Sequence, residues 1–449
     1  PKRWQETLRR CLEKHGFNAC LLEESLYMKI VDGQLTLVST YVDDLWFFSM
    51  NSETLVELMY EISQELRCTA GEMLCGAPVW MFRPESEMSA HLDDQPAAQS
   101  SISDTAQRAH QLTDRQREIV NFFKPIYGEP RFGVATKESP LSYVSIDIYF
   151  QDDYLVLDQT RYVEKAFTKL LEKKVFQEDE QFAMASLFPE NFNHMNLMED
   201  CKANPLLTKE ELTLLRIGVN TLSFYALSVG IGLQAALGQI ARGQSAGRKR
   251  HLTSLKYLIF YAYQHRHEVL KVHCPSWVQK ANVLSEMTIF TQAHVDSSMG
   301  FSGPLGTDAH ARQGCCIMVG VVRDLEGLVQ GKSSLQTTVS LSTCEAELTA
   351  SSWAAKQILG LRNLFKEVFI SSTIDIPRLF GDNRAANLLA SNQASMRNHR
   401  HLQLPQIWIR EQSQQGNIKI FNIDTHVNTS DMLTKVLPHE KLEKLLRLL

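Results

Sequence analysis

Four carboxylates in the last third of the chain have the residue type and placement of a metal site: Asp296, Glu347, Asp382 and Asp431. Each lies at a predicted boundary between elements or at a predicted helix start, where its side chain can face a shared cleft. One acid in such a place more often caps a helix or lies in a solvated loop, but four together favour a metal site. Oxygen ligands without an accompanying Cys pair suit Mg²⁺ or Mn²⁺ rather than zinc. Two such ions, about 4 Å apart, can hold the attacking and leaving oxygens when a phosphodiester is cleaved.

A second acidic signature lies near the N-terminus, in the sequence Tyr41-Val42-Asp43-Asp44. Apolar residues alternate before and after it, which predicts two strands joined by a tight hairpin. Asp43 and Asp44 would then project from the tip of that hairpin. Paired aspartates also mark ordinary turns, so this motif alone leaves a structural and a functional interpretation open.

Length and composition indicate a globular protein of two to four domains, because single cores rarely grow past roughly 250–300 residues. The 449 residues carry a net charge of −5, which does not by itself indicate a nucleic-acid-binding protein. The nine cysteines form no Cys-x-x-Cys pair, so we expect reduced thiols in an intracellular protein rather than a disulfide framework. His265, His267, His273 and Cys274 cluster in the sequence. No second ligand pair follows at zinc-finger spacing, and we expect a solvated connector there.

The N-terminal sequence begins with Pro1 and has no hydrophobic signal segment, so an internal piece of a longer, non-secreted protein is expected. Thr221–Ala241 contains no charge and is long enough to span a bilayer. Its Gln234, Gln239 and glycines lower its hydrophobicity. A buried pair of helices is therefore expected rather than a membrane span.

Hydrophobic periodicity predicts helices and strands in the first 210 residues. The expected helices are 1–15, 52–66 and 161–174, and the expected strands are 26–31, 35–42, 45–48, 141–150 and 154–157. The segment 85–130 is rich in small and polar residues and is predicted to be a low-complexity insertion. Residues 210–270 are predicted to be largely helical, interrupted by a basic loop at 242–250.

The last third of the chain switches to a mixed pattern of strands and helices. Strands are expected at 291–297, 314–322, 336–342, 374–381 and 417–423, and helices at 343–368, 383–392, 401–413 and from 430. Three strands, a helix, and then alternating strands and helices is the element order of an RNase H-like domain.

Six motifs resemble, in order and spacing, the C-terminal part of copia-type retrotransposon polyproteins. They are Tyr41-Val-Asp-Asp44, Gln159-Thr-Arg-Tyr-Val163, Leu341-Ser-Thr-Cys-Glu-Ala-Glu-Leu348, Gly381-Asp-Asn-Arg-Ala385, Trp408-Ile-Arg-Glu411 and Ser430-Asp-Met-Leu-Thr-Lys435. The resemblance implies an α/β and α+β multidomain fold. Its expected parts are a partial reverse-transcriptase palm at 1–84, the insertion at 85–130, a thumb-like region at 131–210, a helical connection at 211–289 and an RNase H-like domain at 290–449.

The resemblance implies that Asp43 ligates metal, that Asp44 supports it, and that Tyr41 and Val42 lie along the primer end. A reverse transcriptase also needs a metal-binding Asp from an earlier palm strand, whereas Asp32 lies in a predicted turn. We therefore expect RNA-directed DNA polymerase activity only if the missing palm and fingers are supplied. An upstream polymerase segment or a second polyprotein chain could supply them.

In the RNase H-like domain, the resemblance makes Asp296, Glu347, Asp382 and Asp431 the catalytic residues that hold two Mg²⁺ or Mn²⁺ ions. Asp296 would bridge both ions. Glu347 is expected to be the ligand rather than Glu345, because Glu-Leu-Thr-Ala matches the pattern of the family. Glu345 is expected to be an exposed residue at the helix start, stabilised by the helix macrodipole.

Three groups of polar and basic residues are candidate contacts for nucleic acid, and a solvated surface is the competing interpretation of each. Arg397 and Arg400 precede a predicted helix, where they could contact phosphates without reading sequence. Asn383 and Arg384 could donate to a phosphate or a ribose. The third group is the basic loop, with Arg242, Arg248, Lys249 and Arg250.

The function implied is metal-dependent hydrolysis of the RNA strand of an RNA–DNA hybrid. The expected partners are that hybrid and a primer–template, and the expected location is a cytoplasmic particle or the nucleus, with no membrane. The alternative is a non-catalytic nucleic-acid-binding remnant, or a structural subunit of a polymerase complex.

Overall fold

The computed structural model contains two compact units, one mainly of Pro1–Gln151 and one mainly of Asp152–Gln279 and Val283–Leu449. Mixed α/β structure is confirmed in both units. The predicted boundaries at 130, 210 and 289 stay predictions. The structure describes residues 2–31, 34–41, 44–49, 58, 60–62, 65–66, 79–80, 131–132, 136–138, 140–177, 197, 199–274, 287–299, 310–370, 372–395 and 404–449. The predicted insertion at 85–130 lies outside the described residues.

The first unit begins with an amphipathic helix on an antiparallel sheet. Helix α1 buries Leu8 and Leu12 against Phe17 and Val38, and Gly16 ends its last turn with a φ of +82° that suits glycine. The elements are α1 (Lys2–Lys14), β1 (Asn18–Ala19), β2 (Leu26–Val31), β3 (Gln34–Tyr41) and β4 (Asp44–Ser49), and the sheet order is β1-β2-β3-β4. The predicted strands before and after the acidic signature are therefore confirmed.

A hairpin follows where a single strand was predicted at 141–150, so that prediction is wrong. The two strands are β7 (Leu141–Tyr143) and β8 (Ile146–Gln151), which pair antiparallel. The residues between them, Val144 and Ser145, have φ values of 44° and 61°. Two positive φ values in a two-residue connection match the twist of a hairpin, but they are usually signalled by Asn or Gly, which this sequence lacks. A parallel pair, β5 (Val79–Trp80) and β6 (Arg131–Phe132), completes the described strands of this unit.

The main sheet of the second unit has the strand directions expected of an RNase H-like domain. Its strands are β11 (Thr288–Ser298), β12 (Arg312–Gly320), β13 (Gly327–Leu335), β14 (Thr373–Ile374), β15 (Arg378–Gly381) and β16 (Lys419–Asn422). The order is β13-β12-β11-β15-β16, with β14 also paired to β11. The first three strands are antiparallel, and β15 and β16 run parallel to β11.

The prediction of a third strand at 336–342 is wrong. The strand that pairs with β12 is β13, which covers Gly327–Leu335 and ends before residue 336. The sequence of β13 did not indicate a strand because it contains Gly331, which looks like a turn residue. This glycine instead allows close packing, since a Cβ at position 331 would lie 3.2 Å from the side chain of Ile231. Residues after Leu335 instead fasten the next helix. Gln336 donates to the carbonyl of Ala346 at 2.7 Å, and Ser340 donates to Gln336 at 2.9 Å.

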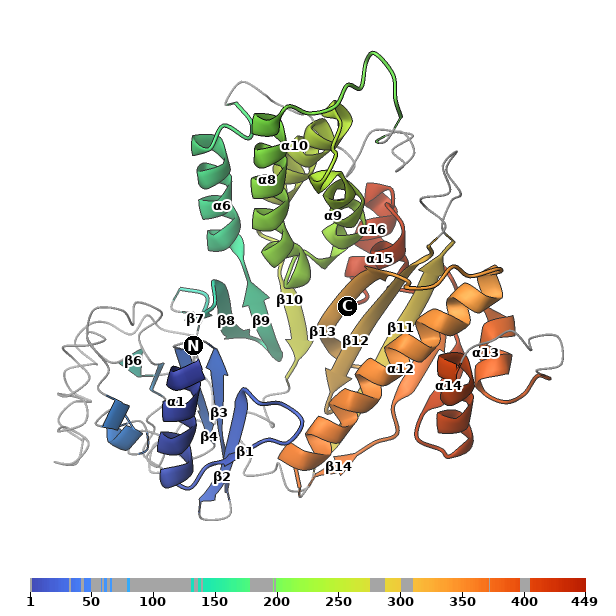
Figure 1. Ribbon diagram of the computed structural model, residues 1–449. Coiled ribbons are helices and arrows are strands. Elements are labelled where there is room, and N and C mark those ends of the chain that lie inside the picture. Colours follow the sequence, from blue (N-terminus) through green and yellow to red (C-terminus); the bar gives the residue numbers. More distant parts are fainter. Residues whose placement is uncertain are drawn as a thin grey trace. The chain divides into compact units, whose positions relative to one another are not determined.

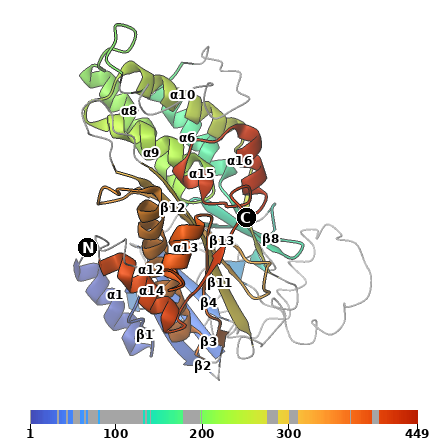
Figure 2. The ribbon, with the colours of Figure 1, turned by 90° about the vertical axis from the view of Figure 1, so that its right-hand side faces the viewer.

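Helices cover both faces of this sheet (Figure 1). On one face, α12 lies along the strands and packs with α13 and α14, which Figure 2 shows grouped together. On the other face, α15 and α16 pack with the helices that precede the sheet in sequence. The helices are α6 (Thr160–Glu172), α8 (Lys209–Leu227), α9 (Gln234–Ala241), α10 (Lys249–Gln264), α12 (Thr343–Val368), α13 (Arg384–Ala390), α14 (Leu404–Gln414), α15 (Asp431–Thr434) and α16 (His439–Leu446), with 3₁₀ turns η1 (Ile231–Leu233) and η2 (Arg242–Gln244). Two short strands, β9 (Tyr154–Asp158) and β10 (Leu270–His273), pair antiparallel.

The uncharged stretch Thr221–Ala241 forms the end of α8, the turn η1 and α9, and most of its apolar side chains are buried in one hydrophobic cluster. The prediction of a buried helix pair is therefore confirmed. Among the residues that the structure describes, no helix is both long and apolar enough to cross a membrane.

Candidate metal centre

Three of the four predicted carboxylates meet at the middle of the sheet. Asp296 lies on the central strand β11, and Asp382 follows directly after β15, the parallel neighbour of β11. Asp431 is the first residue of α15, which packs on β11 and β12. Carboxylate oxygens of these three residues all lie within 4.8 Å of one another. The sequence places them far apart, and the parallel pairing of β11 with β15 brings the first two together.

Glu347, the fourth acid, is buried in the second turn of α12 and accepts a hydrogen bond from the backbone N–H of Ser297. Glu345 has a different role, because its carboxylate accepts from the backbone N–H of Leu341 at 2.8 Å and its own N–H donates to Ser342 at 3.1 Å. Glu345 therefore supports the helix start, whereas Glu347 faces the cluster of aspartates.

Burial makes this site unfavourable for negative charge. Burial raises the pKa of Asp296, while the charge of Lys435 opposes the shift. Burial, followed by repulsion from Asp296 and Asp382, raises the pKa of Glu347 to about 9. Carboxylates that are desolvated and repel one another attract a cation, because a positive charge relieves both effects.

Two lysines that the sequence interpretation did not single out provide part of that positive charge. Lys435 Nζ lies 2.7 Å from Asp431 Oδ1 and 3.2 Å from Asp296 Oδ2, and Lys441 Nζ lies 2.7 Å from Asp431 Oδ2. The hydroxyl of Thr434 also donates to Asp296. The signal for Lys435 was present in the sequence, because it follows Asp431 by four residues and therefore lies one helical turn away.

The residues present fit a divalent ion. The donors are carboxylate oxygens, which Mg²⁺ and Mn²⁺ prefer, and three of them are already close enough to share an ion. Asp431 has both oxygens paired with lysines, so an ion that bound there would displace Lys435 or share Asp431 with it. Asp296 shares Lys435 with Asp431, whereas Asp382 and Glu347 have no lysine contact in the part of the chain that the structure describes.

A second group with metal-binding spacing lies in the first unit and consists of Cys11, His15 and Glu65. It has a simpler explanation, because Glu65 pairs with Lys14 at 2.8 Å and with His15 at 3.3 Å, and Cys11 is part of the core. The histidines considered for zinc do not form such a group among the described residues. His265 instead pairs with Glu268 at 2.7 Å.

The polymerase signature lies on the hairpin predicted for it. Tyr41, the last residue of β3, pairs in register with Asp44, the first residue of β4. Val42 and Asp43 lie outside the described residues. The roles predicted for these four residues stay predictions.

The predicted basic loop is shorter than expected, because Lys249 and Arg250 belong to the first turn of α10. Each of the last three basic residues of this loop pairs with an acid that lies outside the loop. Arg248 contacts Asp200 at 2.8 Å, Lys249 contacts Glu211, and Arg250 contacts Glu199 at 2.6 Å. These pairs explain the three residues structurally without any nucleic acid.

The remaining candidate contacts differ in their surroundings. Asn383 caps α13 by accepting from the N–H of Ala386 at 3.1 Å, and Arg384 is exposed in the first turn of that helix. Arg242 is half-buried in η2. Arg397 and Arg400 lie outside the described residues, and the helix predicted to follow them is α14, which begins at Leu404.

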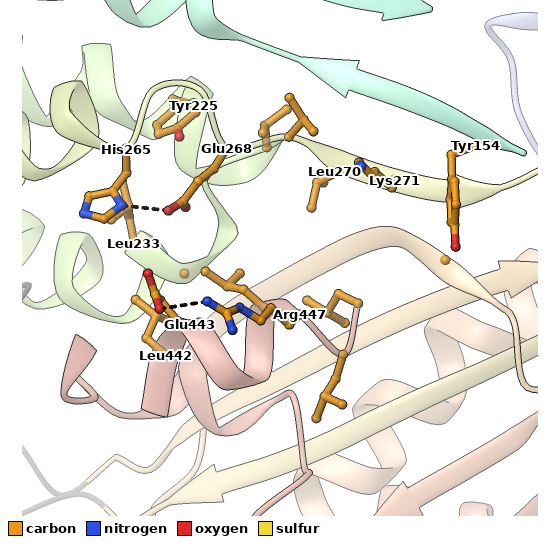
Figure 3. A pocket seen from close by; sticks show the side chains of 18 of the residues that line it. Tyr154, Tyr225, Leu233, His265, Glu268, Leu270, Lys271, Leu442, Glu443 and Arg447 are labelled. Carbon is orange, nitrogen blue, oxygen red and sulfur yellow. Dashed lines mark hydrogen bonds and ion pairs between the residues drawn. The ribbon is translucent and has the colours of Figure 1, made fainter. Parts of the chain in front are cut away.

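A cavity of about 710 Å³ lies in the second unit, away from the acids. Leu233 and Leu442 line it together with Tyr225, and two ion pairs stand at its wall (Figure 3). These pairs are His265 with Glu268 and Glu443 with Arg447. None of the four carboxylates lines this cavity, so it is separate from the candidate metal centre.

No family model matches the chain. The retrovirus-related Pol polyprotein from transposon TNT 1-94 of Nicotiana tabacum is 32% identical to it over 117 residues. That match covers 26% of this chain and 9% of the polyprotein, so the chain spans only a small part of this relative. The similarity to a retrotransposon polyprotein that the motifs predicted is thereby confirmed.

Solved structures that are similar to about a third of the chain are RNase H domains. RNase H1 from Halobacterium salinarum NRC-1 is 16% identical, with a TM-score of 0.22, and covers 34% of this chain and 98% of its own. The N-terminal RNase H domain of a Mycobacterium tuberculosis protein is 10% identical, with a TM-score of 0.22, and covers 36% and 97%. The order and directions of the strands in the main sheet are those expected of an RNase H-like domain.

Proposed function

We propose that this chain, which is similar to a retrotransposon Pol polyprotein, is a ribonuclease H that hydrolyses the RNA strand of an RNA–DNA hybrid. One observation carries the proposal: oxygens of Asp296 on β11, Asp382 after β15 and Asp431 at the start of α15 lie within 4.8 Å of one another at the middle of the sheet. Glu347 adds a buried fourth carboxyl group from α12. Specificity for a hybrid would come from recognising the 2′-hydroxyls of one strand.

The residues of the site have separate tasks in this reaction. Asp296, Asp382 and Glu347, with Asp431, would hold two Mg²⁺ or Mn²⁺ ions. When bound, such ions supply an activated water and neutralise charge on the leaving oxygen. The hydroxyl of Thr434 orients Asp296, and the N–H of Ser297 orients Glu347. These contacts fix the carboxylates before substrate binds, which is the preorganisation that a charged transition state requires.

Lys435 and Lys441 hold Asp431 in place from two sides. Lys435 also lies beside Asp296, so its ammonium group is placed to contact a substrate phosphate at the site. A lysine here lowers the repulsion between the acids and the anionic substrate.

Residues 1–84 would belong to the polymerase part of the same polyprotein, as a partial palm with its hairpin at Tyr41–Asp44. Asp43 would ligate metal there only together with a palm and fingers segment from upstream or from a second chain. Residues 131–210 would form a thumb-like region that contacts the primer–template.

One observation favours a second function, that of a non-catalytic nucleic-acid-binding subunit. Both oxygens of Asp431 are paired with lysines, which would neutralise this acid without any metal. The two functions differ in one measurable property, because only the nuclease requires the acid cluster to bind divalent ions.

The test is cleavage of an end-labelled RNA–DNA hybrid by the purified chain in Mg²⁺, in Mn²⁺ and in EDTA. Wild type should cleave the RNA strand only with a metal and only when it is paired with DNA. Asp382→Asn should abolish cleavage with little change in unfolding, since it removes charge but almost no volume. The matched control is Asp424→Asn, an exposed aspartate beyond β16, which should cleave like wild type.

Wild-type cleavage by Asp382→Asn would show that the metal assignment is wrong. Tight hybrid binding without cleavage in any metal would favour the non-catalytic subunit. Cleavage of single-stranded RNA at the same rate would contradict the assignment to hybrids.

A further inference from the structure

Three buried amide side chains hold the backbone directly before three of the four acids, although the motifs singled out none of them. Each amide donates to the carbonyl of the residue that precedes an acid in the sequence. The bonds run from Asn428 Nδ2 to Val295 at 3.0 Å, from Asn387 Nδ2 to Gly381 at 2.7 Å and from Gln336 Nε2 to Ala346 at 2.7 Å. The acids that follow these carbonyls are Asp296, Asp382 and Glu347.

A carbonyl that is held in place also fixes the residue that follows it. The peptide unit is planar, so the carbonyl of one residue and the N–H and Cα of the next move together. A carboxylate that binds Mg²⁺ tolerates little displacement, because this ion requires near-ideal octahedral geometry at about 2.0–2.1 Å. An amide donor on the preceding carbonyl therefore limits how far a metal-binding acid can move with its backbone.

Asn428 connects two acids that come from different elements. Its residue is fully buried, and Oδ1 accepts from the backbone N–H of Ser430 at 3.2 Å and from the hydroxyl of the same residue at 2.6 Å. A backbone N–H can only donate, so this atom is the oxygen and the amino group faces Val295. The backbone carbonyl of Asn428 accepts from the N–H of Asp431 at 3.2 Å. One residue thus ties the backbone at Asp296 to the first turn of α15.

Gln336, which directly follows β13, contacts the neighbours of two acids. Its amino group donates to the carbonyl of Ala346 and, at 3.3 Å, to the hydroxyl of Ser297. Ser297 follows Asp296 in the sequence and donates its backbone N–H to Glu347. The amide of Gln336 therefore links the backbone of the central strand to the start of α12.

Asn387 fastens α13 to the ends of two strands. Besides the carbonyl of Gly381, its amino group donates to Oδ1 of Asn422 at 2.7 Å, and these two residues pair in register between β15 and β16. The carbonyl of Gly381 also accepts from the N–H of Ile423 at 3.0 Å. A variant without the amide of Asn387 would therefore leave that carbonyl hydrogen-bonded, and it should still fold.

A buried amide that bonds to backbone is common and does not by itself indicate a function. Asn204 is as buried as Asn428 and also makes three hydrogen bonds, two to carbonyls and one from the backbone N–H of Arg250. None of the residues that it contacts is next to one of the four acids in the sequence. Asn428, Asn387 and Gln336 differ from it because their acceptors precede acids of one cluster.

We propose that Asn428, Asn387 and Gln336 are positioning residues, which hold the four acids in the geometry that a divalent ion requires. This inference rests on the proposed function, because the ions act in that reaction. Among the described residues, no hydrogen bond joins one of these amides to a side-chain oxygen of the four acids, so the amides act through the backbone. Losing a group that orients metal ligands typically weakens metal binding or activity roughly 10–100-fold.

The test measures Mn²⁺ binding by the purified chain without nucleic acid, from the electron paramagnetic resonance signal of free Mn²⁺. Asn387→Leu removes an amide with little change in volume, and Asn428→Ala removes all three bonds of that side chain. Both should raise the Kd for Mn²⁺ roughly 10-fold or more, because the acids are then held less firmly. The matched control is Asn204→Ala, which should lose about as much stability in urea as Asn428→Ala but bind Mn²⁺ like wild type.

Cleavage of a hybrid gives a second measurement that a loss of stability alone would not change. The Mg²⁺ concentration for half-maximal cleavage should rise by a similar factor in Asn387→Leu and in Gln336→Met. KM for the hybrid should stay within about twofold of wild type, because neither change removes a group that is proposed to touch the substrate. At saturating Mg²⁺ the rate should recover toward wild type, since all four carboxylates remain.

The results separate this inference from the proposed function. If wild type binds Mn²⁺ and cleaves hybrids, and folded Asn387→Leu and Asn428→Ala keep the wild-type Kd, the positioning role is wrong and the nuclease stands. If Asn204→Ala weakens Mn²⁺ binding as much as Asn428→Ala, general destabilisation explains the loss, and the positioning role is again wrong. If Asn428→Ala does not fold, Asn387→Leu decides. If wild type neither binds Mn²⁺ nor cleaves a hybrid, both proposals fail together.

Discussion

Glu347→Gln should make the metal-free protein more stable while it removes nuclease activity. The ordinary pKa of a glutamate is 4.5, and burial with the charges of Asp296 and Asp382 raises that of Glu347 to about 9. A carboxyl group with a raised pKa takes up a proton on folding, so it opposes folding at any pH above its unfolded value. At pH 7 the difference is about 2.5 pH units at about 1.4 kcal/mol each, or about 3 kcal/mol. Glutamine has nearly the same shape and no proton to take up.

The sign of this effect fixes its pH dependence. Glu347 destabilises the folded chain increasingly as pH rises from its ordinary pKa to its raised pKa. The gain in Glu347→Gln should therefore be near zero at pH 4.5, below about 1 kcal/mol at pH 5 and about 3 kcal/mol at pH 7. Because the raised pKa lies above 7, the value at pH 7 depends only on the pKa in the unfolded chain.

The assay is urea unfolding in EDTA at pH 5 and pH 7, followed by cleavage of a hybrid in Mg²⁺. Glu347→Gln should also cleave at least roughly 10²-fold more slowly, the scale of losing one charged group from a preorganised site. The matched control is Glu345→Gln, which should cost about 0.5 kcal/mol at the helix start and leave cleavage nearly unchanged. A Glu347→Gln protein that is no more stable than wild type at pH 7, or equally stabilised at both pH values, would refute the reasoning. If cleavage depended on Glu345 instead, the ligand would be Glu345.

Two further predictions concern the packing around the acids. Gly314→Ala should lower the free energy of unfolding by about 1–3 kcal/mol and slow cleavage, since its methyl group would lie 2.7 Å from the Cβ of Leu433 and displace α15. Gly360→Ala, which meets nothing within 4 Å on α12, should instead raise the free energy of unfolding by about 0.5–1 kcal/mol, and equal effects in urea unfolding would contradict this argument. Cys315 and Cys316 are buried, and burial raises the pKa of both thiols, so neither should react with a thiol reagent at pH 8 until urea is added. Rapid labelling of either cysteine in the native protein, read by peptide mass spectrometry, would show that this sheet is more open than its burial indicates.

The acids of the site could be predicted because their signals are local. Asp296 lies near the end of β11, Asp382 directly follows β15 and Asp431 begins α15. The family motifs give the order of these acids along the chain. Strand β13 was misplaced because its two glycines look like turn residues, although they are needed for close packing. Gly331 lies against Ile231, and a Cβ on Gly327 would lie 2.6 Å from the backbone of Val272. Such contacts are made by residues distant in sequence, and local periodicity does not contain them.

The basic residues show the same limit for electrostatics. Arg248, Lys249 and Arg250 form the densest basic run of their region, yet each pairs with an acid that lies far from it in sequence. Arg312 stands alone in the sequence, but the fold buries it close enough to Arg242 for that charge to lower its pKa. Whether a cation is available to an anionic ligand depends on its partners in space. A sequence motif therefore identifies a basic residue but not its availability.

The helices before the sheet matter to the candidate active site because they hold α15. Met432 and Leu433 of α15 are buried in the same hydrophobic cluster as α8, α9 and α10. Gln234 of α9 donates to the carbonyls of Ala226 and Gly331 at 2.9 and 2.8 Å, which fastens the helices to β13. Since α15 begins with Asp431 and is followed by Lys435, the positions of an acid and of its balancing cation depend on this packing. The packing of these helices therefore acts on the chemistry of the site through α15.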